Sequence, residues 1–531
     1  MCSSRALILL SVVLAAGLPL RAETPVEEPL SAIDWLSRSV ATPAAMPPRP
    51  VIPAEPPVTS GVSSAPITMV PIDGPSLDAI GLSSVARTGL PRTLWGTTAS
   101  ADLARMIRTE RVDTLPAVQS LLYTLLLAEL TPPADSDGQG TLYLARIDKL
   151  LDLGALDPAL SLLELADNPP PEVFRRWFDV ALLTGEEDRA CEMMRKTPGI
   201  SPTFPARVFC LARGGDWNAA ALSLRTGETL GYIEPEMVPL LERFLDPALA
   251  DEAPDLPEPV RPSPLVLRLM EAIGQPLQTS TLPLAFAQAD LRSNAGWKTR
   301  LEAAERLART GAIEPNLLLG LYTERQAAAS GGVWERVRAI QALDAAIGAG
   351  DRKATALALS AAWRQMTDVE LEVPFAALYG QALSGLALDG EAGALAFRIG
   401  LLSDGFEAVA RARKPADGPG DGPADGPGRG DEAFLIGLAE GDASGTVPPD
   451  QMGAAIQAAF AAAPSPAPEL KALEDEHRTG EALLRAIDQI TDGARGDLRA
   501  VTEGLVFLRH VGLETTARRA ALELVLLERR G

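Results

Sequence analysis

Histidine and cysteine are scarce in this chain of 531 residues, which has two histidines and three cysteines. His477 and His510 are each isolated in the sequence, so few histidines are available to form a metal site or a catalytic triad. The His-Glu-x-x-His, Gly-x-Ser-x-Gly, phosphate-loop and Ser-x-x-Lys motifs do not occur. The sequence therefore predicts no catalytic residue, no metal site and no cofactor.

Positive charge is also scarce. The chain has 48 lysines and arginines against 70 acidic residues, which gives a formal net charge of −22, and only six of its basic residues are lysines. Nucleic acid phosphates and anionic lipid surfaces would be repelled by this charge. Aromatic residues make up 5% of the chain, while alanine and leucine dominate. This composition favours helices packed through small side chains over β-sheets.

Carboxylates are the remaining candidates for chemistry. Pairs such as Glu186-Glu187 and the run Glu474-Asp475-Glu476 are interpreted as solvated helix faces in an acidic protein. The alternative is a glycoside hydrolase, which requires two carboxyl groups that converge in one cleft. The tandem Asp-Gly-Pro units after Lys414 lack the calcium-loop spacings, so we interpret them as a solvated low-complexity loop.

The first 22 residues have the features of a secretory signal peptide. A short basic start at Arg5 precedes an apolar run from Ala6 to Leu20, and Ala22 supplies a small residue for cleavage. The alternative is an uncleaved membrane anchor. We predict export to the periplasm or beyond, with no integral membrane segment after signal cleavage.

Proline, alanine and serine dominate residues 23–64, which predicts a disordered arm. Residues 30–40 interrupt the arm with a pattern typical of a short amphipathic helix, whose candidate docking residues are Leu30, Ile33, Trp35, Leu36 and Val40. This segment either docks on another protein or folds back on its own chain.

Composition and periodicity divide the rest of the chain into helical and irregular segments. The predicted segments are an irregular stretch that packs on the helices (65–98), a first helical array (99–245), a proline-rich acidic linker (246–264), a second helical array (265–412), the low-complexity loop (413–432) and a C-terminal helical region (433–531). Within the first array, residues 115–130 are predicted to form a buried leucine-rich helix that is too short to span a membrane.

A pattern recurs three times between residues 142 and 224: a short apolar helix, a glycine turn, and a second helix with an alanine five residues after the glycine. The glycine and alanine pairs are Gly154 and Ala159, Gly185 and Ala190, and Gly215 and Ala220. Glycine permits a left-handed helix end, and alanine lets two helices approach closely. In the first turn we expect Asp157 to cap the next helix and Pro158 to be its first residue. A spacing of about 30–35 residues is typical of helical solenoids.

These turns, above all Gly215-Asp-Trp-Asn-Ala-Ala220, resemble the inter-helix turn of the tetratricopeptide repeat. The resemblance extends over roughly 85 residues, with a looser match over perhaps 300. It implies an all-α superhelix with a concave face that binds proteins, and it implies no enzymatic activity.

Two cysteines remain after signal cleavage, Cys191 and Cys210. They are predicted to lie on helices of adjacent repeats, which allows a disulfide in an oxidising compartment. The alternative is a pair of buried free thiols. The predicted function is a non-enzymatic exported scaffold that binds protein partners of the bacterial cell envelope. The alternative is a cell-wall glycan hydrolase with a helical superstructure and carboxylate-based catalysis.

Overall fold

The computed structural model describes residues 76–167, 169–252, 254–413, 429–461 and 463–527. Several predictions lie outside these residues: the signal peptide, the arm at 23–64 with its docking residues Leu30, Ile33, Trp35, Leu36 and Val40, and most of the low-complexity loop.

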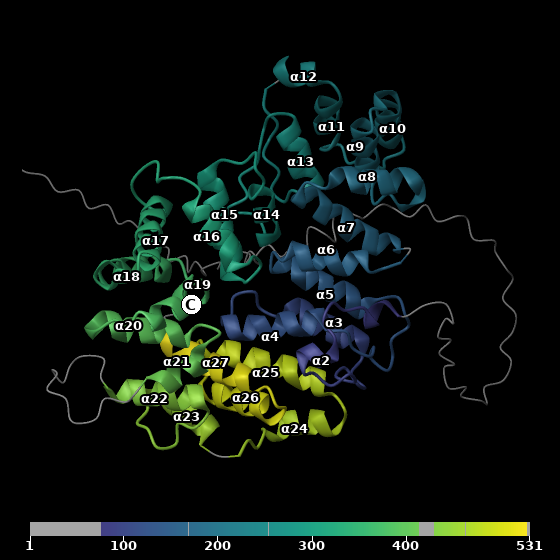
Figure 1. Ribbon diagram of the computed structural model, residues 1–531. Coiled ribbons are helices and arrows are strands. Elements are labelled where there is room, and N and C mark those ends of the chain that lie inside the picture. Colours follow the sequence, from purple (N-terminus) through teal and green to yellow (C-terminus); the bar gives the residue numbers. More distant parts are fainter. Residues whose placement is uncertain (1–75, 168, 253, 414–428, 462, 528–531) are drawn as a thin grey trace, which may run out of the picture. The chain divides into compact units, whose positions relative to one another are not determined.

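The described part of the chain is all-α, as the sequence predicted (Figure 1). It forms 26 α-helices and three short 3₁₀ helices, and it contains no β-strand. An isolated β-bridge joins Ser83 and Ala128.

The N-terminal third of the described chain begins with one 3₁₀ helix and continues as short helices joined by tight turns. Its elements are η1 (Leu77–Ala79), α2 (Val85–Thr88), α3 (Ser100–Thr109), α4 (Pro116–Leu127), α5 (Thr141–Asp152), α6 (Leu156–Glu164), α7 (Pro171–Thr184), α8 (Glu187–Lys196), η2 (Pro198–Ile200), α9 (Phe204–Arg213), α10 (Trp217–Thr229) and α11 (Val238–Leu245).

The middle third continues with helices that include the two longest. They are α12 (Pro247–Glu252), α13 (Pro264–Ala272), η3 (Leu284–Phe286), α14 (Ala287–Asp290), α15 (Trp297–Arg309), α16 (Pro315–Thr323), α17 (Val333–Gly348), α18 (Arg352–Thr367), α19 (Glu372–Gly385), α20 (Gly390–Leu401) and α21 (Phe406–Ala412). The predicted linker at 246–264 therefore contains one short helix, followed by residues 254–263, which are not helical.

Six helices complete the described chain: α22 (Arg429–Glu440), α23 (Gln451–Phe460), α24 (Pro468–Asp475), α25 (Thr479–Gly493), α26 (Leu498–His510) and α27 (Glu514–Leu526). No helix among the described residues is both long enough and apolar enough to cross a membrane. The leucine-rich stretch near residue 120 instead forms α4, whose apolar side chains are largely buried.

Arg146 is the largest charged side chain that is fully buried, and it joins α5 to the segments around it. Its Nε, Nη1 and Nη2 atoms donate hydrogen bonds to the carbonyl oxygens of Leu126, Ile80 and Ala128, over distances of 2.7, 2.7 and 3.0 Å. Because the backbone stops being helical after Leu127, these carbonyls have no helical partner, and the guanidinium supplies one. A single side chain therefore fixes the end of α4 and the chain before α2.

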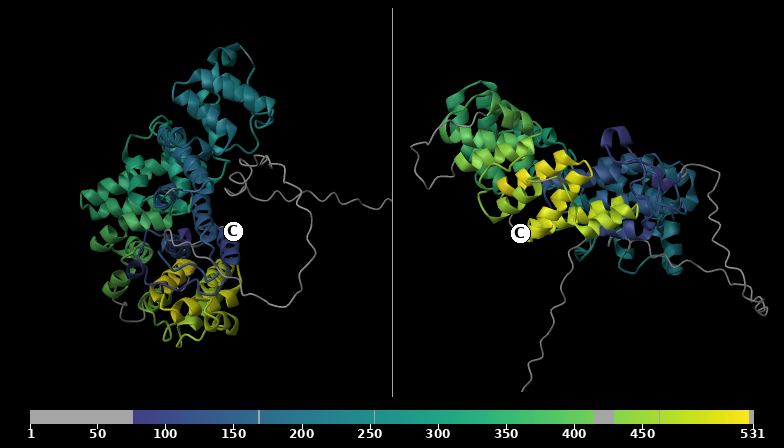
Figure 2. Two further views of the ribbon diagram at one scale, coloured as in Figure 1. Left: turned by 90° about the vertical axis from the view of Figure 1, so that its right-hand side faces the viewer. Right: turned by 90° about the horizontal axis from the view of Figure 1, so that it is seen from below.

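The C-terminal helices pack on the N-terminal ones, so the helices do not form a simple linear series. Helix α27 packs against α4, and α25 packs against α3 and α4, an arrangement visible in two orientations (Figures 1 and 2). The backbone N–H of Ala117 donates to Glu523 Oε2 over 2.8 Å, and the N–H of Gly480 donates to the Leu94 carbonyl over 2.8 Å. The hydroxyls of Thr114 and Thr491 are hydrogen-bonded at 2.7 Å.

We call this packing of the C-terminal helices on the N-terminal ones the closure of the fold. Two main hydrophobic cores follow from it. The first combines buried side chains of residues 90–289 with those of residues 397–522. The second combines side chains of residues 301–402 with Leu527. The predicted linker at 246–264 lies within residues 90–289, which contribute side chains to the first core.

Candidate functional site

The three predicted turns join α5 to α6, α7 to α8 and α9 to α10. Gly154, Gly185 and Gly215 have φ angles of 75°, 88° and 83°, which lie in the left-handed region. In the first turn Gly154 and Ala155 donate their N–H groups to the carbonyls of Leu151 and Leu150, which satisfies the end of α5. Consecutive helices of this stretch pack on one another from α5 to α10.

The three predicted alanines are buried in the second helix of each pair. Ala159, Ala190 and Ala220 are each 0% exposed. A larger side chain at these positions would force the helices apart, because protein interiors are close-packed. The glycine and alanine positions are therefore structural, and we assign them no chemistry.

The predicted start of the helix after Gly154 is wrong. Helix α6 begins at Leu156 with Ala155 as its N-cap, so Asp157 and Pro158 lie inside the first turn and Asp157 does not cap the helix. The turn closes at Ala155, which leaves no residue between it and the helix. In the third turn, Asp216 is the N-cap and its carboxylate accepts from the N–H of Ala219 over 3.0 Å.

Gly154 and Gly215 form a matched pair for mutation to alanine. Both have positive φ, but an alanine Cβ at Gly154 would lie 2.7 Å from Leu307 Cδ2 and 2.9 Å from Leu284 Cγ, whereas at Gly215 no atom lies within 4 Å. We expect Gly215→Ala to lower the free energy of unfolding by about 1 kcal/mol, because of backbone strain. Gly154→Ala adds the clash and should cost about 1–3 kcal/mol more. Urea denaturation measures both, and equal losses would contradict the packing of Gly154 against these leucines.

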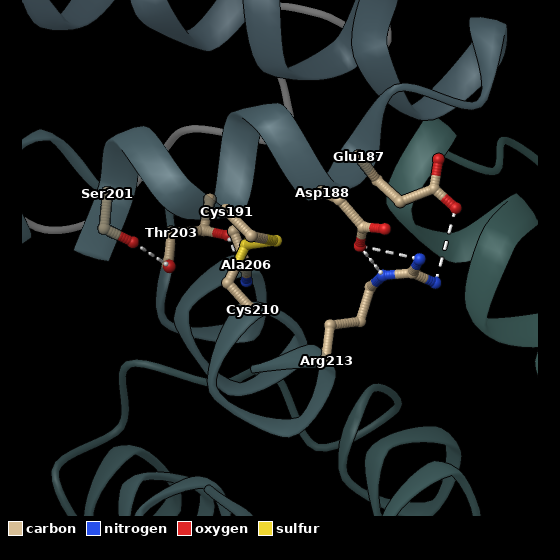
Figure 3. The surroundings of a disulfide bond; sticks show 8 residues. All are labelled: Glu187, Asp188, Cys191, Ser201, Thr203, Ala206, Cys210 and Arg213. Carbon is tan, nitrogen blue, oxygen red and sulfur yellow. Dashed lines mark hydrogen bonds and ion pairs between the residues drawn. A yellow bond between two sulfur atoms is a disulfide. The ribbon is translucent and has the colours of Figure 1, made fainter. Parts of the chain in front are cut away.

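Cys191 on α8 and Cys210 on α9 are joined by a disulfide, with their Cα atoms 5.0 Å apart (Figure 3). The bond links the second helix of one pair to the first helix of the next. Figure 3 shows a second connection beside it, in which Arg213 of α9 reaches toward Asp188 and Glu187 of α8. The Arg213 guanidinium lies 2.7 Å from Asp188 Oδ1 and 3.4 Å from Glu187 Oε1.

A cavity of about 440 Å³ lies beside this disulfide, and both cysteines line it. Six charged residues also line it: Arg195, Arg207, Arg213, Asp188, Glu192 and Asp216. Asp216 directly precedes Trp217, the first residue of α10, which is half exposed. A residue that lines the cavity is therefore adjacent in sequence to a half-exposed aromatic residue.

Glu187 is an exception to the predicted solvated faces, because its side chain is buried. Arg268 of α13 forms an ion pair with Glu187 over 2.5 Å, in addition to the contact from Arg213. A partner 81 residues away in sequence therefore compensates for the desolvation of this carboxylate. The sequence around Glu187 contains no signal for that partner.

A buried ion-pair network joins α3, α5 and α7. Asp148 of α5 accepts hydrogen bonds from Arg176 Nε at 2.5 Å and Arg108 Nε at 3.2 Å. Asp179 is also buried in α7, and burial raises its pKa to about 7 despite the nearby charges of Arg175 and Arg176. Sequence reasoning missed this network.

Two carboxyl groups meet where the N- and C-terminal helices join. Glu110, at the C-terminus of α3, is hydrogen-bonded through its side chain to Asp488 of α25. Burial, followed by the charge of Asp488, raises the pKa of Glu110 to about 9. Burial and the charge of Asp492 raise the pKa of Asp488. Glycosidase carboxyls are held about 5–9.5 Å apart around a substrate, whereas these two are hydrogen-bonded to each other.

The two histidines do not meet. His510 ends α26 and its Nε2 lies 2.9 Å from Glu474 Oε2, while His477 lies in the turn before α25. Among the described residues, no group of three or more His, Cys, Asp or Glu side chains converges in the way a metal site requires. We therefore assign no residue as a metal or cofactor ligand.

Comparison of the chain with protein-family models, curated proteins and solved structures found no significant match.

Proposed function

We propose that this protein is an exported, non-enzymatic scaffold whose helical repeats bind protein partners in the bacterial cell envelope. The repeats would form a superhelix similar to that of tetratricopeptide-repeat proteins. The observation that supports this most is the succession of three helix pairs from α5 to α10 with the same glycine turn and the same buried alanine. Repeats built in this way present extended surfaces suited to binding other chains.

Helix α10 and its C-cap carry three of the exposed large apolar side chains. Trp217, Leu222 and Leu230, at the start, in the middle and at the C-cap of this helix, are 50%, 69% and 59% exposed. Scattered exposed leucines are ordinary on protein surfaces, but tryptophan is enriched among the residues that anchor protein partners. We place the partner contact on α10 and the rim of the 440 Å³ cavity.

Site-specific photocrosslinking in the producing bacterium tests this proposal. A photoreactive residue at Leu222 should crosslink to a distinct partner. The same residue at Leu357 on α18, a leucine that is 82% exposed against 69% for Leu222, should not. With the partner purified, Trp217→Ser should weaken binding about tenfold or more, as is typical of an interface anchor. Equal crosslinking at the two positions would contradict the assignment of the surface.

Two further measurements test the other parts of the proposal. The mature protein isolated from the periplasm should begin near Glu23 if the signal peptide is cleaved, and an intact Met1 would contradict this.

A zymogram on cell-wall material should give no clearing. Clearing that is lost in a Glu110→Gln variant would overturn the scaffold and establish a carboxylate-based hydrolase.

A further inference from the structure

The surroundings of the two sulfur atoms differ. Along α9, Arg207 and Arg213 lie one turn before and one turn after Cys210. Along α8, Asp188 lies one turn before Cys191 and Arg195 one turn after it. Cys210 therefore has a cationic side chain on both sides along its helix, and Cys191 has one cation and one anion.

Arg207 and Arg213 are not equivalent. Arg213 forms ion pairs with Asp188 and Glu187, which compensate its charge (Figure 3). Arg207 donates to the Pro198 carbonyl over 2.8 Å and lies over the Phe204 ring at 5.7 Å, and neither group carries a charge. Its guanidinium is thus a positive charge that these contacts leave uncompensated, whereas Arg195, the third arginine of the cavity, lies 3.9 Å from Glu192.

The disulfide also lies in the wall of an open cavity. Cys191 and Cys210 are mostly buried, with exposed fractions of 8% and 9%, and both line the cavity of about 440 Å³. A structural disulfide without such an opening resists attack because thiolates do not reach it, whereas access through a cavity and nearby cations favour thiol exchange.

We propose that this cavity is a thiol-exchange site, in which a small anionic thiol of the size and charge of glutathione opens the Cys191–Cys210 disulfide in the folded protein. The thiolate attacks Sγ of Cys191, so a new S–S bond forms as the old one breaks. The electron pair stays on Sγ of Cys210, which leaves as a thiolate beside Arg207 and then takes a proton from water. A second molecule of the thiol completes the reaction, releasing its own disulfide and the reduced Cys191.

Opening the bond would change how the repeats are connected. The disulfide ties α9 to α8, and α9 packs on α10, the helix that exposes Trp217. After exchange, the Arg213 ion pairs still join α8 to α9. The expected outcome is a looser α8–α9 contact in a protein that remains folded.

The test measures the rate of opening in the folded protein, with acid quenching, alkylation and peptide mass spectrometry, using reduced glutathione and neutral 2-mercaptoethanol as probes. We expect the rate to rise in proportion to thiol concentration and glutathione to be found on Cys191, with Cys210 free. Relative to the urea-unfolded chain, the folded protein should prefer glutathione over 2-mercaptoethanol by about fivefold or more. A rate that is independent of thiol concentration and equal to the global unfolding rate would overturn the proposal, and so would glutathione attached mainly to Cys210.

Three variants locate the reaction in the cavity. Arg207→Gln should remove the preference for glutathione, whereas Arg225→Gln, an exposed arginine on α10 that does not line the cavity, should retain it. Leu211→Trp should fill the cavity and slow exchange about tenfold in the folded protein while leaving the unfolded chain unaffected. Exchange at the wild-type rate in both Arg207→Gln and Leu211→Trp would refute the cavity as the route.

Discussion

Replacing Arg146 with methionine should lower the free energy of unfolding by about 3–6 kcal/mol, because three buried carbonyl oxygens lose their hydrogen-bond donor at once. Methionine has a similar length and removes the buried charge, so the loss reports mainly on the orphaned carbonyls of Ile80, Leu126 and Ala128. Urea denaturation followed by circular dichroism measures the change.

Arg105→Met is the matched control. Arg105 is an exposed arginine on α3 that forms an ion pair with Asp102, three residues earlier, and its replacement should change stability by less than about 1 kcal/mol. If Arg146→Met costs no more than this control, the three carbonyls must find other donors, and the role assigned to Arg146 is wrong.

Glu110→Gln should make the protein more stable at alkaline pH and should weaken the dependence of stability on pH. The pKa of Glu110 is raised from its ordinary value of 4.5 to about 9, so the native state keeps a proton that the unfolded state releases above pH 4.5. Stability is therefore lost as pH rises between these two values, by at most about 1.4 kcal/mol for each pH unit. Glutamine donates the same hydrogen bond to Asp488 without a titrating proton, so the loss should disappear.

Urea denaturation at pH 5, 6, 7 and 8 provides the measurement. Between the ends of this range, the stability of Glu110→Gln relative to the wild type should increase by about 2–4 kcal/mol. Asp488→Asn should act in the same direction, because it removes a charge that raises the pKa of Glu110, and the double variant should gain less than the sum of the two. Parallel pH profiles for Glu110→Gln and the wild type would show that the pair does not titrate as described.

The local features of the helix pairs from α5 to α10 could be predicted from sequence because they depend on neighbours a few residues away. A glycine that ends one helix and an alanine five residues later are set by short-range sterics, and Gly154, Gly185 and Gly215 all adopt the expected left-handed conformation. The placement of Cys191 and Cys210 on neighbouring helices follows from the same pattern of helices and glycine turns. The start of α6 was placed incorrectly, since helix boundaries vary by one or two residues.

The contacts that join distant segments could not be predicted. Arg146 donates hydrogen bonds to carbonyls up to 66 residues away, and Glu187 forms an ion pair with Arg268. The hydroxyl of Thr114 is hydrogen-bonded to a hydroxyl 377 residues later in the chain. No local pattern marks these residues, because an arginine or glutamate that will be buried looks like one on a solvated helix. The closure of the helices at Ala117 and Glu523 belongs to the same class.

This closure has a consequence for how the chain reaches its native state. Ala117 and its partner Glu523 are 406 residues apart, and at about 5–20 residues per second a ribosome needs roughly 20–80 seconds to synthesise the segment between them. During that interval α3 and α4 expose leucines whose native neighbours do not yet exist. Exposed apolar surface of this kind favours aggregation until the last helix is available to cover it.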